Sequence, residues 1–286
     1  MTRILCAGHA NWDVTLRVDR LPQPDDEARI VSQHQSGGGS AANAAAVLAQ
    51  LHADATLLGS VGPDEHGRDI RAELTALGVE TRFLETVGTE TTVKYLVVDR
   101  TGEVFMLGNE GANEAFVVDT AVSEEFEQID HLHLTSQRPE TALELAQQAA
   151  ERDVSVSFDP GRRVADREYE PVLERADLLF VTEREFESIE TDRPGQTMVV
   201  KRGAKGAQLR EGDRTVSHPG FEVDVVDTAG AGDAFAGGFL AARGTRPAEE
   251  ALAVANACGA LAVQSLGART HLSWDGIDAL LADMDR

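Results

Sequence analysis

Short apolar segments alternate with longer, helix-like segments along most of this chain of 286 residues. Strands of a parallel sheet are apolar throughout, because the helices that connect them cover both faces of the sheet. The sequence therefore predicts an α/β fold with a mostly parallel central sheet flanked by helices on both faces. The expected strands lie at residues 3–8, 54–62, 131–136, 154–160, 177–182 and 198–203, and the expected helices at 43–51, 66–78, 140–153, 168–176 and 234–244.

Two regions depart from this alternation. Residues 12–21 with 27–35, and residues 91–107, alternate polar and apolar side chains, which is typical of strands with one solvated face. We expect them to form a small antiparallel β lid that stands off the main sheet. The chain has no linker, repeat or low-complexity segment, so we expect a single domain over residues 1–286.

The charge balance restricts the class of partner. The formal net charge is −23, and arginine supplies nearly all of the positive charge because only three lysines occur. Such a surface disfavours nucleic acids and acidic membranes. It indicates either adaptation to high salt, where ions screen the repulsion among carboxylates, or an ordinary acidic cytosolic protein. The first residues lack the apolar core of a signal peptide, so we expect a cytoplasmic protein with no membrane partner.

The stretch "VVDTAGAGDAFAGGFL", residues 225–240, carries the strongest chemical signal. We interpret residues 221–226 as a strand and the glycine-rich segment as a turn into a helix. That geometry leaves the backbone amides of Ala231, Gly232 and Asp233 free at a helix N-terminus, which suits a phosphate group. A Walker A loop does not fit, because no Gly-Lys-Ser/Thr follows. The dinucleotide fingerprint fails as well, because Phe235 occupies its third glycine position.

Asp233 has two interpretations. A carboxylate in the first turn of a helix complements the helix dipole, and this is common. A carboxylate beside an anion pocket also repels a resident anion. It has a clear use where a hydroxyl must lose a proton as it attacks a phosphorus held by the amides. The second interpretation describes a kinase.

Two segments resemble the signatures of one family. "DTAGAGDAFAGGFL" and "GGGSAANAAAVLAQLHADATLLGSVG", residues 37–62, look like the signatures of the ribokinase-like, or pfkB, carbohydrate kinases. The second segment departs from the pattern only at His52, in a turn. The resemblance covers essentially the whole chain and implies a ribokinase-like fold with ATP-dependent phosphorylation of a monosaccharide hydroxyl. It also implies that Asp233 is the general base and that the anion hole comprises Gly230, Ala231, Gly232 and the amide of Asp233.

The resemblance also assigns the sugar site, to Asp13, Gly38, Gly39 and Asn43. Taken alone, Asp13 could be a turn residue and Asn43 a helix N-cap. We also expect Asp159 and Arg162 to bind the substrate, because they lie at the C-terminal end of a predicted strand, at the sheet edge where α/β proteins bind ligands. An arginine there could read a carboxylate or phosphate on the substrate, stack near ATP, or pair with an acid of the protein.

The remaining expectations concern the nucleotide and the ions. The resemblance implies that ATP is bound by Lys201, Gly203, Gly206, Asn256 and Gly267. It implies Mg²⁺ near Glu185, with Thr182 where the family usually has asparagine, and a monovalent cation, K⁺, near Asp227. A homodimer through the β lid is a further expectation. A nucleoside kinase of the same fold and a non-catalytic sugar- or nucleotide-sensing protein remain as alternatives.

Overall fold

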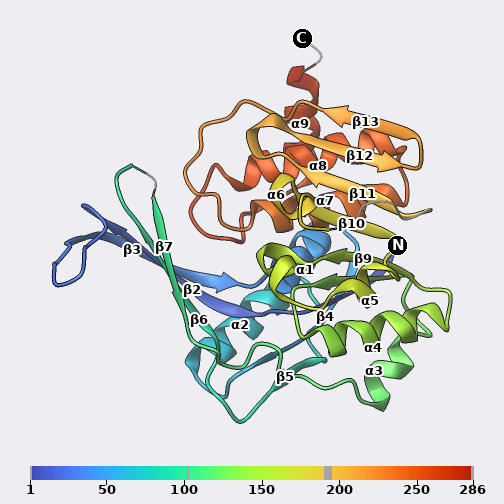
Figure 1. Cartoon of the computed structure of the whole chain (residues 1–286), viewed down its shortest axis with the longest axis horizontal. Coiled ribbons are helices and arrows are strands. Elements are labelled where there is room, and N and C mark those ends of the chain that lie inside the picture. Colours follow the sequence, from blue (N-terminus) through green and yellow to red (C-terminus); the bar gives the residue numbers. More distant parts are fainter. Residues whose placement is uncertain (1, 102, 190–194, 285–286) are drawn as a thin grey trace.

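A computed structural model describes residues 2–101, 103–189 and 195–284. Its centre is a nine-stranded sheet with the order β13-β12-β11-β10-β9-β8-β1-β4-β5 (Figure 1). All neighbouring strands are parallel except at one edge, where β12 and β13 run antiparallel. The predicted mostly parallel sheet is thus confirmed. The strands are β1 (Arg3–Ala7), β4 (Asp54–Val61), β5 (Leu84–Thr86), β8 (His131–Thr135), β9 (Ser155–Asp159), β10 (Leu178–Thr182), β11 (Thr197–Lys201), β12 (Ala207–Glu211) and β13 (Arg214–His218).

Both faces of this sheet are buried. Along β1, Ile4 and Cys6 belong to one hydrophobic cluster and Leu5 and Ala7 to the other. This explains why the strands are continuous apolar runs. The first face is covered by α1 (Ser40–Gln50), α2 (Glu65–Ala76), α7 (Ala231–Arg243), α8 (Ala248–Ala262) and α9 (Trp274–Met284), and the second by α3 (Thr120–Glu125), α4 (Pro139–Ala150) and α5 (Glu170–Leu173). Two short 3₁₀ helices, η1 (Gly161–Asp166) and η2 (Gly203–Lys205), and α6 (Glu183–Phe186) follow β9, β11 and β10.

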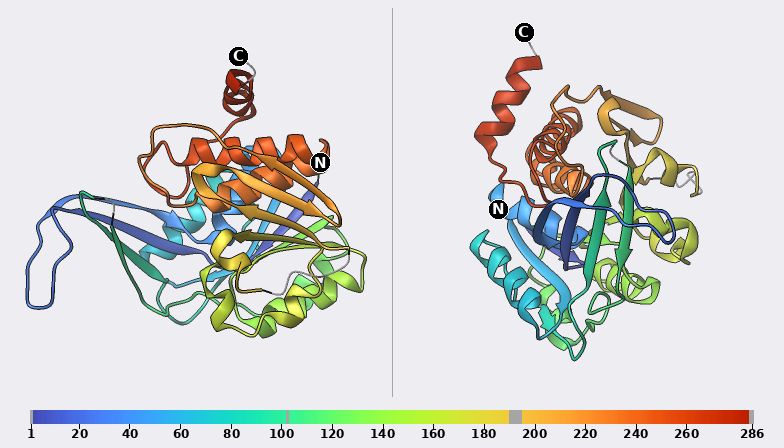
Figure 2. Two further views of the ribbon diagram at one scale, coloured as in Figure 1. Left: turned by 45° about the horizontal axis from the view of Figure 1, so that its top comes forward. Right: turned by 90° about the vertical axis from the view of Figure 1, so that its left-hand side faces the viewer.

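The predicted lid is present and projects from the body (Figures 1 and 2). It contains β2 (Asn11–Val18), β3 (Ile30–Gly38), β6 (Val93–Val98) and β7 (Val104–Gly108) in the order β3-β2-β6-β7. The outer pairs are antiparallel hairpins, but the central pair of β2 and β6 is parallel. The predicted turn between β6 and β7 includes Gly102, which lies outside the described residues.

The strand that we predicted at residues 221–226 is wrong. The segment has no regular secondary structure, and Val225 and Val226 are exposed. The amides of Val226 and Asp227 both donate to the carbonyl of Val263, just after α8. Alternating side chains resemble a strand, but here the chain is held by the end of a helix rather than by a sheet edge. Among the described residues, no helix is both long and apolar enough to cross a membrane.

Candidate active site

The predicted site residues gather at one edge of the sheet. Asp159, Thr182 and Lys201 are the last residues of three neighbouring parallel strands, β9, β10 and β11. The carboxyl ends of parallel strands meet at the same edge, where open α/β sheets bind their ligands. The first turn of α7 lies at this edge as well, because Gly232 faces Lys201, and α1 joins it through the contact of Asn43 with Asp233.

The turn before α7 leaves backbone amides free, as expected. Gly230 has a φ of +73°, and a Cβ atom at this position would clash with the carbonyl of Ala268. A glycine is therefore required to start the helix here. The amide of Ala231 makes a long contact of 3.4 Å to the carbonyl of Thr228. The amides of Gly232 and Asp233 have no hydrogen-bond partner among the described residues, so they can bind an anion at this helix N-terminus.

Asn43 holds the Asp233 carboxylate in place. Its Nδ2 donates to Asp233 Oδ2 at 2.8 Å, and its Oδ1 accepts from Arg269 Nε at 3.1 Å. Because a guanidinium can only donate, Arg269 fixes which end of the amide faces Asp233. The two helices approach closely at Gly237, where a Cβ atom would lie 2.9 Å from Val47 Cβ. Asn43 is the fourth residue of α1, so the N-cap alternative is wrong.

Asp233 is partly buried, and its surroundings favour the protonated form. Its pKa is raised to about 6, because desolvation and the nearby Asp159 outweigh the hydrogen bond from Asn43 and the charges of Lys201 and Lys94. A general base works best with a pKa near the operating pH. Asp233 is in the first turn of α7, as the dipole interpretation also requires. A helix-dipole contact requires neither desolvation of the carboxylate nor a hydrogen bond from Asn43, so these two features favour the general-base interpretation.

Asp13 lies next to the glycine-rich end of β3. Its carboxylate contacts the backbone of Gly38 so closely that a Cβ atom there would collide with it, and Asn11 donates to the carboxylate from the same strand. The pKa of Asp13 is raised to about 6, because desolvation outweighs the opposing charges of Lys94 and Arg269. Asp13 is in the middle of strand β2, so the turn-residue alternative is wrong.

Lys201 faces the free amides of α7. A Cβ atom on Gly232 would lie 3.6 Å from Lys201 Nζ, and Nζ forms an ion pair with Asp159. Desolvation alone would lower the pKa of Lys201, but the carboxylates of Asp159, Glu185 and Asp233 raise it overall. Lys201 therefore remains a cation beside the anion pocket. Asp159, which we predicted to bind the sugar, is engaged by this lysine.

The site thus combines an anion pocket, a partly buried cation and two partly buried carboxylates. The sequence profile described as pfkB family carbohydrate kinase matches residues 1–275. The chain belongs to this family. It is a sugar or nucleoside kinase, an ATP-dependent phosphotransferase with a hydroxyl acceptor.

Proteins similar to this chain within the pfkB family include sugar kinases and nucleoside kinases. The ATP-dependent ribose-1-phosphate kinase of Halopiger xanaduensis is 50% identical over 293 residues, which cover 99% of this chain and 99% of the relative. The nucleoside kinase structure from Methanocaldococcus jannaschii has a TM-score of 0.85 at 25% identity and covers 99% of each chain. The ribokinase structure from Thermotoga maritima has a TM-score of 0.87 at 25% identity and covers 99% of this chain and 100% of that one. The expected ribokinase-like fold is confirmed.

The structure places the residues that we predicted to bind the nucleotide in two turns and one helix. Their roles remain predictions. Gly203 and Gly206 have positive φ values of +57° and +79°, as a tight turn after β11 requires. Asn256 is buried within α8 and donates to the carbonyl of Leu252 in its own helix. Gly267, with a φ of +88°, follows α8.

The predicted ion residues form two local structures. Asp227 accepts from the amides of Ala229 and Gly267, at 3.0 and 3.1 Å, and so joins the turn before α7 to the loop after α8. Thr182 and Glu185 form the capping box of α6, in which each side chain accepts from the backbone amide of the other. No group of three or more potential metal-ligating His, Cys, Asp or Glu side chains occurs in the described part of the chain.

Arg162, which we expected to read the substrate, lies exposed in η1. A different arginine from the same region faces inward. Arg167 Nη1 lies 2.8 Å from Glu114 Oε1, which also contacts His9 Nε2 at 2.8 Å. Sequence reasoning missed these residues, and it missed Arg269 and Lys94. The scarcity of lysine was the one signal that could have singled out Lys94.

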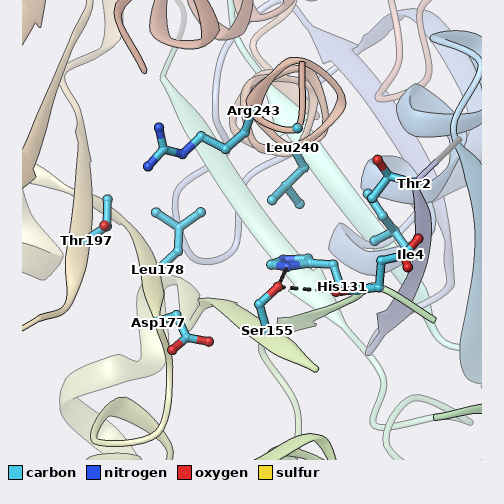
Figure 3. Close-up of a pocket in the computed structure, with 11 residues that line it drawn as sticks. Thr2, Ile4, His131, Ser155, Asp177, Leu178, Thr197, Leu240 and Arg243 are labelled. Atoms are coloured by element: carbon cyan, nitrogen blue, oxygen red, sulfur yellow. Dashed lines mark hydrogen bonds between the residues drawn. The ribbon is translucent and has the colours of Figure 1, made fainter. Parts of the chain in front are cut away.

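A separate cavity of about 260 Å³ lies at the opposite edge of the sheet (Figure 3). It is lined by residues at the amino ends of the strands, among them Ile4, His131, Ser155 and Leu178, and by Arg243 of α7. No predicted site residue lines it. The pfkB site at the carboxyl ends of the strands is therefore a different place.

Proposed function

We propose that this chain phosphorylates ribose 1-phosphate with ATP. The observation that carries this proposal is the partly buried Asp233 carboxylate, held by Asn43 beside the free amides of its own helix. The choice of substrate is supported by the relative named ATP-dependent ribose-1-phosphate kinase, which is 50% identical over 99% of both chains. The primary hydroxyl at C5 is the least hindered of the free hydroxyls of ribose 1-phosphate and is the proposed acceptor.

The reaction follows from the positions of these groups. Asp233 accepts the proton of the sugar hydroxyl as the hydroxyl oxygen forms a bond to the terminal phosphorus of ATP. The bond between that phosphorus and the bridging oxygen of ADP breaks, and ADP leaves. The amides of Gly232 and Asp233 and the ammonium of Lys201 face the phosphoryl oxygens and stabilise their charge. Asp13 and Asn43, with Gly38 and Gly39, hold the sugar hydroxyls.

The nucleotide and its ions fit the remaining residues. We assign the ATP phosphates to the turn at Gly203 and Gly206, and the adenine to the region of Asn256 and Gly267. Glu185 is buried and close enough to Lys201 for their charges to interact, so its carboxylate can hold Mg²⁺ through water. Bound Mg²⁺ would neutralise charge on the ATP phosphates. Asp227 and the loop at Gly267 offer oxygen ligands for K⁺.

We also propose that the lid forms a homodimer contact. Large apolar side chains are exposed on its outer strands, at Ile30 and Val31 of β3 and at Val104–Leu107 of β7. Such patches mark interaction surfaces in many proteins. Light scattering of the wild type and of a Val31→Asp, Phe105→Asp variant would test this, because the variant should be a monomer if the lid is the contact.

A substrate panel tests the proposed reaction. Ribose 1-phosphate, ribose, fructose, inosine and adenosine would each be incubated with ATP in molar KCl, with the product identified by phosphorus NMR and the Asp233→Asn variant as control. We expect phosphorylation of ribose 1-phosphate at C5 with the highest kcat/KM. Preference for a free nucleoside would contradict the proposal and support the second candidate, a nucleoside kinase. That candidate is favoured by the structural match to the Methanocaldococcus jannaschii enzyme, with a TM-score of 0.85.

A further inference from the structure

Three cations lie within electrostatic reach of the carboxylates of Asp13 and Asp233, and two of these cations have partners. Lys201 is paired with Asp159. Arg269 is only 2% exposed and contacts Glu73, Asn43 and the carbonyl of Gly38. Lys94 differs, because its ammonium has no ion pair or hydrogen bond with any residue in the described part of the chain. A half-buried cation that faces a binding site without a partner is available for a ligand.

The fold directs Lys94 toward the sugar site. It is opposite Asp13 in the parallel pairing of β6 with β2, and residues paired in this way project their side chains from the same face of a sheet. On its other side it pairs with Gly108 of β7, where a Cβ atom would lie 3.7 Å from Lys94 Cγ. The charge of Lys94 also lowers the pKa values of Asp13, Asp233 and His9. The ammonium therefore lies near all three groups.

We propose that Lys94 binds the phosphate group that the sugar substrate already carries, and so selects a phosphosugar over the free sugar. This inference rests on the proposed function. With the acceptor hydroxyl at Asp233 and the other sugar hydroxyls at Asp13, the substituent at C1 remains to be accommodated. Lys94 is opposite Asp13 on the neighbouring lid strand.

The charge of the site explains why a cation is needed there. Asp13 and Asp233 would repel a dianionic substrate, although a neutral sugar would bind to them through its hydroxyls. Lys201 faces the amides that we assign to the transferred phosphoryl group, and Arg269 is engaged with Glu73, so neither cation is placed to offset the charge at C1. Lys94 supplies the missing positive charge. Its place on the lid also means that the phosphate would hold the lid against the body.

Binding measurements on one pair of variants test the role of Lys94. Lys94→Met keeps most of the apolar stem and removes the charge, while Arg100→Met removes an exposed cation elsewhere on the lid. Calorimetry would measure the Kd of ribose 1-phosphate, ribose and ATP for each protein. We expect Lys94→Met to weaken ribose 1-phosphate by about 10- to 100-fold, with the Kd values of ribose and ATP nearly unchanged. Lys94→Arg should recover part of the loss, and Arg100→Met should behave as the wild type.

The failure of this inference can be distinguished from the failure of the proposed function. If the wild type prefers ribose 1-phosphate and Lys94→Met binds it as tightly, the assignment to Lys94 is wrong and the proposed function stands. If Lys94→Met weakens ribose and ribose 1-phosphate equally, Lys94 supports the site structurally and does not read the phosphate. If the wild type itself binds ribose at least as tightly as ribose 1-phosphate, both the proposed function and this inference are wrong.

Discussion

Asn43 and Asp233 are 190 positions apart in the chain, yet Asn43 Nδ2 donates to Asp233 Oδ2 at 2.8 Å. One residue is on α1 of the first glycine-rich segment and the other on α7 of the second. The contact joins the proposed sugar side of the site to the proposed phosphoryl side. Arg269 fixes the orientation of the amide from the other side, so two side chains position Asp233, the proposed general base.

The substitution Asp233→Asn should separate catalysis from stability. It keeps the size of the side chain and removes the base, so we expect kcat to fall by about 10²- to 10⁴-fold. At pH 8 the variant should also be more stable than the wild type, on the order of 1–3 kcal/mol, because a desolvated carboxylate with a raised pKa is replaced by a neutral group. Stopped assays and thermal melts measure the two effects. A variant that keeps most of its kcat would contradict the assignment of the base.

The activity should depend on pH through Asp233. Desolvation raises its pKa from 3.8 to about 6, and only the deprotonated form can accept a proton. We therefore expect kcat/KM to fall as the pH decreases below about 6. The free energy of unfolding should change with pH in the opposite direction, since the folded state binds the proton of Asp233 more tightly than the unfolded state does. Stability should decrease as the pH rises from about 3.8 to about 6 and this loss should vanish in Asp233→Asn.

The Asp13 carboxylate has a similar pKa, also raised to about 6 by desolvation, and must be distinguished from Asp233. The Asp13→Asn variant should bind the sugar more weakly, but its kcat should still decrease below about pH 6. If this decrease disappears in Asp13→Asn, the group that titrates is Asp13 and not Asp233.

Arg269 should act as a positioning residue. Arg269→Met leaves Glu73 and the Asn43 amide without their cationic partner, and breaking a buried ion pair costs about 3–5 kcal/mol, toward the lower end here because Glu73 is partly exposed. We expect a lower kcat. We also expect the loss of activity at low pH to begin at a higher pH, since the charge of Arg269 stabilises the ionised forms of the nearby carboxylates. Arg269→Lys, which keeps the charge, serves as the variant that folds more readily. The exposed Arg68→Met on α2 is the control, and an unshifted pH profile in both Arg269 variants would show a purely structural role.

The melting temperature should rise with salt. The chain carries 49 acidic residues against 26 lysines and arginines, and salt shortens the range of their repulsion from about 10 Å at 0.1 M to about 3 Å at 1 M. Calorimetric scans across this range of KCl would measure the effect, with an uncharged osmolyte of equal osmolarity as control. A flat melting temperature would mean that the acidic surface is no adaptation to salt.

The sequence alone determined the architecture and indicated the group that we propose to react. Alternation of apolar strands with helices dictates a parallel sheet covered on both faces, because only such strands are apolar throughout. The glycine turn at residues 229–232 dictates a helix start with free amides, and the acid that follows indicated a base. These signals are local, since each arises from a few neighbouring residues and the backbone conformations that they allow.

The tertiary structure decided which side chains meet. Arg269 and Lys94 carry no local signal, and they become site residues only because a loop after α8 and a lid strand fold over Asn43 and Asp13. The position of Asp159 at the end of a strand predicted that it would bind the sugar. In the structure, Lys201 at the end of β11, two strands away, forms an ion pair with it instead. Residues 221–226 alternate as a strand does and still form none, because pairing requires a sheet edge that another segment must supply. Long-range contacts of this kind depend on the order of strands and the packing of helices, which no short pattern contains.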